Sequence, residues 1–234
     1  MTLYETIFTR RSVRKYDPTP LDESTLADIN AFLNRANQLN THHARFEIVT
    51  GDKVGDKSAP HYIVAYCGEN TAAYVNVGYV LEKVDLYLQS IGLGSLWLGM
   101  AKPKEDKQDF CIMLAFGNTS VPARKNVEEF NRLPISEISN SDNSGNCDIA
   151  KAVRLAPSAV NNQPWKLKFE EGCVTIGYFG RGLMKLILKN RLNKIDLGIC
   201  TRFVIEALRH EGKHIKSIEP KTEGKEFEVA VEYE

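Results

Sequence analysis

The sequence has no excess of charge of either sign. Its 234 residues hold 30 lysines and arginines against 30 aspartates and glutamates, and the isoelectric point is near 7.0. A chain with no overall field does not attract nucleic acid or an anionic membrane, so we expect any anion site to be local.

Long apolar runs and paired cysteines are also missing. The apolar runs are shorter than a membrane span, and Met1–Arg10 lacks the apolar core of a signal peptide, so we expect a cytoplasmic protein. No Cys-x-x-Cys pair occurs, which argues against a zinc ribbon and a disulfide framework. We expect reduced, buried thiols at the five cysteines, Cys67, Cys111, Cys147, Cys173 and Cys200.

Two patterns recur along the chain at a nearly constant spacing. A helical apolar periodicity from about residue 76 ends at Gly92, and another from Asp196 ends at Gly212, with their glycines and apolar residues 120 residues apart. The strand-like residues 46–51 recur 121 residues later as 167–172. Agreement in both order and spacing favours an internal duplication over chance periodicity of ordinary helices and strands.

A polar stretch separates the two patterns. Residues 135–147 are rich in Ser, Asn, Asp and Gly, so we interpret them as a linker between a first half, 1–134, and a second half, 148–234. Helices and strands mix without regular βαβ alternation, which favours the α+β class. Besides the repeated patterns, we expect helices around residues 26–33 and 149–155 and strands near 61–67, 111–116, 174–178 and 227–233.

Three short segments could carry chemistry. The first, Thr9–Tyr16, has Arg10, Arg11, Arg14 and Lys15 beside Ser12, and guanidinium groups fork onto phosphate oxygens. A solvated basic patch is the alternative interpretation.

The second segment is the loop Ala156–Trp165, APSAVNNQPW. Its hydroxyl and amide groups offer donors and acceptors that suit the edge of a planar heteroaromatic ring. An ordinary polar loop anchored by Trp165 is the alternative.

The third segment, GLGSLWLG at Gly92–Gly99, has glycines after a helix. A dinucleotide-binding fingerprint requires a preceding strand and a glycine where Trp97 stands, so we reject that reading.

Together the three segments resemble the FMN-dependent nitroreductase family, which carries an Arg-Arg-Ser-x-Arg opening, an Ala-Pro-Ser loop ending in Gln-Pro-Trp, and a Gly-Leu-Gly-Ser-x-Trp segment. The order differs, because here the Pro-Ser loop lies in the second half. Typical members resemble intertwined homodimers with the flavin at the subunit interface. The resemblance therefore implies a nitroreductase-like, internally duplicated pseudo-dimer in which each half keeps only the signature that still meets a flavin.

The resemblance also implies roles for individual residues. It places Arg10, Arg11, Ser12, Arg14 and Arg124 around the phosphate and pyrimidine ends of FMN, and Leu98, Gly99 and Met100 near flavin N5 through their backbone N–H groups. The second half would contribute Pro157, Ser158, Ala159, Asn161 and Gln163 to the ring and ribityl chain.

The reaction implied is reduction of a nitroaromatic or quinone-like acceptor by NADH or NADPH through flavin N5, with no side-chain nucleophile, in a monomer or a homodimer. A flavin-binding or purely structural protein without turnover is the alternative. A remoter one is a zinc metallopeptidase from His210-Glu211-Gly212-Lys213-His214, although Gly212 breaks the helix that would have to hold both histidines on one face.

Overall fold

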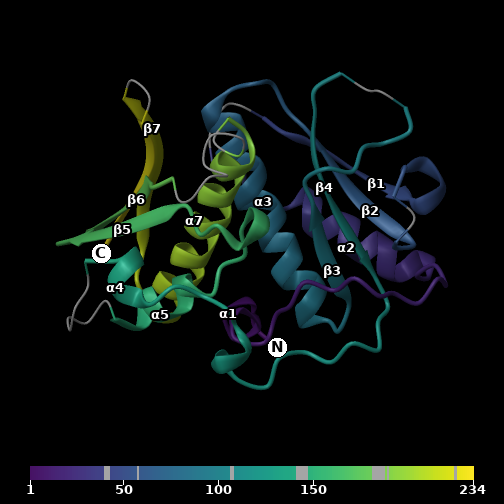
Figure 1. The fold of residues 1–234 in the computed structure, drawn as a ribbon, viewed down its shortest axis with the longest axis horizontal. Helices are drawn as coiled ribbons and strands as arrows, with labels where there is room; N and C mark the ends of the chain where they lie inside the picture. The colour runs from purple at the N-terminus through teal and green to yellow at the C-terminus, as the bar shows by residue number, and fades with distance from the viewer. Residues whose placement is uncertain are drawn as a thin grey trace.

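Two long helices lie between two four-stranded antiparallel sheets (Figure 1). The computed structural model describes residues 1–39, 43–56, 58–105, 108–140, 147–180, 188, 190–223 and 226–234. The long helices, α3 (Thr71–Ser90) and α7 (Leu192–His210), pack against each other at the centre of the molecule. Both were predicted from their apolar periodicity, and both are buried along most of their length.

The first sheet belongs to the first half of the chain and has the order β1-β2-β4-β3. Its strands are β1 (Arg45–Thr50), β2 (His61–Tyr66), β3 (Gly94–Leu98) and β4 (Phe110–Gly117). Every residue of β2 is buried, because Ile63 faces the main core while Tyr62 and Val64 face a smaller apolar cluster on the other side. Burial on both faces explains the continuous apolar run that predicted this strand.

The second sheet repeats this arrangement as β5-β6-β8-β7. Its strands are β5 (Trp165–Glu170), β6 (Cys173–Tyr178), β7 (Ile215–Glu223) and β8 (Glu226–Tyr233). In each half the long helix connects the second strand to the third. The sequence did not predict β3, which is short and begins at a glycine, or β7, an edge strand that contains Pro220 and many charged residues.

Short helices complete the fold: α1 (Leu3–Ile7), α2 (Glu23–Asn34), α4 (Ile135–Ile138), α5 (Cys147–Arg154), and the 3-10 turns η1 (Gly51–Lys53), η2 (Val127–Glu129) and η3 (Ala159–Asn161). Thr2 and Glu5 form a capping box that begins α1, and the Asp22 side chain accepts a hydrogen bond from Thr25 N–H at the start of α2. The predicted linker therefore begins with α4, while its residues 141–146 lie outside the described residues.

No helix in the described part of the chain has both the length and the apolar character needed to span a membrane. The fold is an α+β fold, as the irregular mixture of helices and strands predicted.

Candidate active site

A cavity of about 660 Å³ is lined by residues from both halves of the chain. This volume falls within the range of about 300–1,000 Å³ that is usual for small-molecule and cofactor sites. Of the residues singled out in the sequence, it is lined by Arg10, Ser12, Arg14, Gly99, Met100 and Arg124 from the first half and by Pro157, Ser158, Ala159 and Asn161 from the second. Arg11, Leu98 and Gln163 are not among the described residues that line it.

The N-terminal segment reaches the cavity by running alongside β3. Val13 N–H donates to Ser95 O at 2.8 Å, and Ser12 forms an isolated parallel bridge with Ser95. This pairing fixes the direction of the segment, so that Ser12 and the exposed Arg14 both line the cavity.

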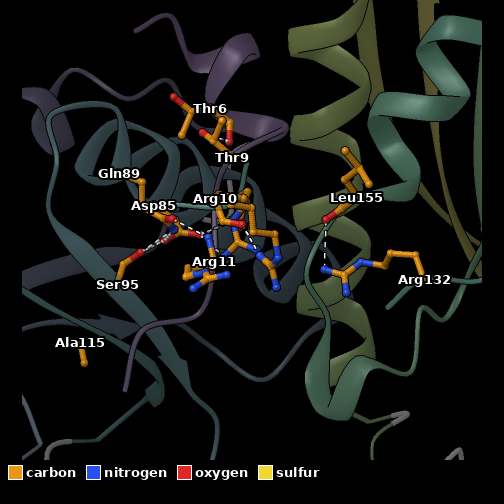
Figure 2. Close-up of polar contacts among 12 residues, drawn as sticks. Thr6, Thr9, Arg10, Arg11, Asp85, Gln89, Ser95, Ala115, Arg132 and Leu155 are labelled. Carbon is orange, nitrogen blue, oxygen red and sulfur yellow. Dashed lines mark hydrogen bonds and ion pairs between the residues drawn. The ribbon is translucent and has the colours of Figure 1, made fainter. Parts of the chain in front are cut away.

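Arg10 is 2% exposed, and its charge is neutralised inside the protein. Its Nη2 and Nε donate to Asp85 Oδ2 at 2.8 and 3.2 Å (Figure 2). Its Nε also lies 3.8 Å from Glu82 Oε1. Burial raises the pKa of the Glu82 carboxyl well above its ordinary value, and Asp85 adds to this effect. Asp85 is therefore the main counter-charge of Arg10.

Arg11 does not line the cavity, although its ion-pair partner Glu129 does. Its backbone N–H donates to Gln89 Oε1 at 2.8 Å, and its Nη2 pairs with Glu129 Oε2 at 2.9 Å. Because both groups of that ion pair are partly exposed, the pair orients the segment more than it stabilises the fold.

Arg124 is anchored to the same segment. Its backbone N–H donates to Thr9 O at 2.8 Å, its Nη1 donates to Arg10 O, and its guanidinium carbon lies 4.1 Å from the centre of the Phe130 ring. Burial lowers the pKa of this guanidinium, and the charge of Arg10 lowers it further.

Arg132 is a cavity residue that the sequence did not reveal. Its Nη2 donates to Leu155 O at 3.1 Å (Figure 2). Its Nη1 donates to Asn161 Oδ1 at 2.7 Å, and the two bonds tie the end of the first half to the second. Burial, followed by the charges of Arg10 and Arg124, lowers its pKa. Cations that oppose one another around one cavity are stabilised by a bound anion.

The loop before β5 has a strained backbone. Val160, Asn161 and Gln163 have φ of 47°, 58° and 48°, and they are three of the four non-glycine residues with positive φ in the described chain. Such values are unfavourable for a β-branched residue and persist only where neighbouring contacts impose them.

Hydrogen bonds from inside the loop and from its surroundings hold it in this shape. Gln163 N–H donates to Ser158 Oγ at 2.8 Å, and Ala159 N–H donates to Asp196 Oδ1 at 3.0 Å. The buried Gln163 amide accepts from Leu133 N–H at 2.9 Å and donates to Asn161 O at 3.2 Å. Gln163 thus supports the loop from within, while Pro157–Asn161 line the cavity.

The exit of β3 forms another wall. Gly99 and Met100 line the cavity, whereas Leu98 packs against the smaller apolar cluster on the other face of the sheet. Arg191 Nη2 donates to Gly99 O at 3.3 Å and joins this exit to the start of α7.

Asp196, at the start of α7, also lines the cavity and was noted in the sequence only as a helix start. The internal repeat could have identified it, because Asp196 stands 120 residues after Asn76 and the two side chains have the same shape. Arg132 had no comparable signal, because a single arginine in a polar connection is not distinctive.

The two histidines of the metallopeptidase-like segment, His210 and His214, do not line the cavity. His210 ends α7 and stacks on Tyr4 with 3.8 Å between ring centres, and His214 follows Gly212, whose φ is 74°. His61 is buried, and its Nε2 accepts from Leu21 N–H at 2.9 Å, which is a core role.

Comparison with protein families matches residues 2–206 to the family described as "Putative TM nitroreductase". The chain belongs to this nitroreductase family. No curated protein sequence matches it.

Solved structures of nitroreductases share the fold. A "putative nitroreductase" from Thermotoga maritima MSB8 superposes with a TM-score of 0.71 and 22% identity, over 99% of this chain and 93% of that one. A nitroreductase family protein from Clostridium difficile 630 gives a TM-score of 0.50 and 18% identity, over 58% of this chain and 96% of that one. A "putative nitroreductase" from Desulfovibrio desulfuricans, solved in complex with FMN, gives a lower TM-score of 0.41 and 16% identity, over 57% of this chain and 98% of that one.

Proposed function

We propose that this nitroreductase-family chain is an FMN-dependent oxidoreductase with one flavin site, the cavity between its two halves. The observation that carries the proposal is that one cavity joins Ser12 and Arg14 to Pro157–Asn161, segments that lie far apart in the sequence. These are the segments whose composition resembles the two parts of a nitroreductase flavin site.

The residues present fit FMN. Arg14, Arg124 and Arg132 with the Ser12 hydroxyl supply donors for a phosphate, and burial and mutual repulsion make the cations Arg124 and Arg132 favour an anion there. Arg10 contributes less directly because Asp85 already neutralises it. On the opposite side, the loop Pro157–Asn161 offers hydroxyl, amide and backbone groups for a heteroaromatic ring and its sugar chain.

We further propose that the chain is an internally duplicated pseudo-dimer, with halves 1–134 and 148–234. The two sheets have the same strand order, and each half has its long helix at the same place in that order. In addition, the Clostridium difficile 630 protein superposes over almost its whole length on little more than half of this chain. One chain with two nitroreductase-like halves would form its site internally.

When bound, FMN supplies a ring that takes a hydride from NADH or NADPH and passes electrons to an acceptor such as a nitroaromatic or a quinone. The protein's role is to bind FMN, to orient its ring and to leave that ring accessible to a second molecule. Met100 and Val160 line the cavity while 88% and 70% exposed, so the cavity is open to solvent beside them. A second small molecule can approach there.

Anaerobic reduction tests the proposal against its alternative, a flavin-binding protein without turnover. Purified protein loaded with FMN should lose its flavin absorbance when NADH or NADPH is added, and should regain it when a nitroaromatic or a quinone follows. Protein that binds FMN but is reduced by neither nucleotide would support the alternative. Protein that does not bind FMN would contradict both.

A further inference from the structure

Asp196 is a buried acid with one oxygen that has no partner. It is 3% exposed, and its Oδ1 accepts the hydrogen bond from Ala159 N–H at 3.0 Å. Its Oδ2 is buried and has no hydrogen-bond partner among the residues that the structure describes, and the residue lines the cavity. A buried polar atom without a partner at a cavity wall indicates a missing ligand group.

The first half contains the same arrangement with its partners complete. Asn76 Oδ1 accepts from Leu39 N–H at 2.8 Å, and Asn76 and Leu39 each stand 120 residues before Asp196 and Ala159. Here, however, Asn76 Nδ2 donates to Gln38 Oε1 at 2.7 Å. In the first half the second atom of this side chain thus donates inside the protein. In the second half the equivalent atom, Asp196 Oδ2, has no partner among the described residues, and its residue lines the cavity.

The two side chains have the same shape, but only a protonated carboxyl can donate as the amide does. Burial raises the pKa of Asp196 to about 8, and the hydrogen bond from Ala159 N–H opposes that rise only in part. At neutral pH the side chain therefore carries a proton. Because Oδ1 accepts from Ala159, the proton belongs on Oδ2.

Charged neighbours do not change this conclusion. Burial dominates the shift, and no charged group of the described residues contributes to it. The thiol of Cys200 faces Asp196 from the next turn of α7, and burial raises its pKa well above the ordinary value, so it is neutral. The charged groups that line the same cavity from the first half are Arg10, Arg14, Arg124, Glu129 and Arg132.

We infer that Asp196 is a proton-carrying ligand of the cavity, which donates a hydrogen bond from Oδ2 to an acceptor atom of bound FMN. This inference rests on the proposed FMN site and adds to it a residue outside the three signature segments.

The sign of the pH dependence follows from linkage. Protein without FMN holds the proton below pH 8 and loses it above, whereas the complex needs it. FMN affinity should therefore be constant up to about pH 8 and fall beyond it, with the dissociation constant rising about tenfold between pH 7 and pH 9. An ionised Asp196 that accepted a hydrogen bond from FMN would give the opposite trend.

The experiment measures FMN affinity at pH 7 and pH 9, by quenching of flavin fluorescence, in the wild type and three variants. Asp196→Asn keeps a donor that does not titrate, so its dissociation constant should lack the roughly tenfold rise expected of the wild type between pH 7 and pH 9. Asp196→Ala removes the donor and should weaken binding at pH 7 by about tenfold. Asp148→Asn, which removes an exposed acid, should behave as the wild type.

The comparison with Asp196→Asn isolates this residue, because every other side chain is the same in the two proteins. The inference is overturned if wild-type affinity rises with pH, if Asp196→Asn retains the wild-type pH dependence, or if Asp196→Ala binds FMN as tightly as the wild type. A wild type that binds no FMN at either pH would overturn the proposed function as well, and the two failures are therefore distinguishable.

Discussion

Gly78 of α3 and Gly198 of α7 lie where the two central helices cross, and each packs against the backbone of the other helix. A Cβ atom on Gly78 would lie 2.0 Å from Ile195 O, and one on Gly198 would lie 2.0 Å from Val75 O. Ile195 and Val75 are themselves 120 residues apart, so the contacts are reciprocal. Reciprocal contacts of this kind are typical of an interface with two-fold symmetry, which supports the proposed pseudo-dimer.

Substitution of either glycine should separate the helices. We expect Gly78→Ala and Gly198→Ala each to lower the free energy of unfolding by about 2 kcal/mol or more, since the new methyl group meets backbone that cannot rotate away. Gly68→Ala is the matched control, because a Cβ there meets no atom within 4 Å. Urea denaturation measures all three. Helix variants as stable as the control would contradict the close crossing.

Removal of Arg10 should damage the fold rather than the cavity alone. Arg10→Ala leaves Asp85 buried without its main counter-charge, so we expect a loss of about 3 kcal/mol in unfolding free energy. Arg11→Ala breaks a partly exposed pair with Glu129 and should cost less than about 1 kcal/mol. Thermal or urea unfolding distinguishes them, and equal losses would argue against this ranking.

Substitution of Arg14 should weaken FMN binding with little effect on the free energy of unfolding, because its exposed side chain lines the cavity. We expect Arg14→Ala to weaken FMN binding about tenfold, the loss of one charge-assisted contact. Lys15→Ala removes the neighbouring exposed cation, which does not line the cavity, and should leave the affinity within about twofold of the wild type. Isothermal titration calorimetry with FMN measures the dissociation constant of each variant. Equal effects of the two variants would favour a diffuse basic patch.

The raised pKa of Asp196 predicts a pH-dependent stability in protein without FMN. Its pKa is about 8 in the folded chain against 3.8 for the ordinary group. Its stabilising contribution is therefore present at low pH and lost as the pH rises toward 8. Compared with the wild type, Asp196→Asn should gain more than about 1 kcal/mol between pH 5 and pH 8, since one pKa unit corresponds to about 1.4 kcal/mol. Urea unfolding at both pH values checks this, and a constant difference would contradict it.

The sequence predicted those parts of the fold whose burial is regular. The helical periodicity of α3 and α7 and the apolar run of β2 follow directly from how each element is covered. The edge strand β7 escaped prediction because its pairing with β8 satisfies the backbone without an apolar pattern.

The candidate site, too, was predicted only in part from the sequence. Motif phrases identified the segments that meet at the cavity, but not the direction of each side chain within them. Gln163 turns inward to bond Leu133 N–H, and Arg11 turns to Glu129. Arg132 reaches the cavity only because tertiary contacts with Asn161 and Leu155 O place it there. No local pattern encodes such contacts.

The central claim is that two unlike halves form a single flavin site, and the number of FMN molecules bound per chain tests it most directly. The residues before Asn76 in the first half lack the Pro-Ser loop, and residues 135–234 contain no Arg-Arg-Ser segment, so a second site would lack both signatures. Titration of flavin-free protein should therefore saturate at one equivalent per chain, and Ser158→Trp, which fills the cavity from the second half, should abolish binding. Saturation at two equivalents, or full binding by Ser158→Trp, would contradict the account.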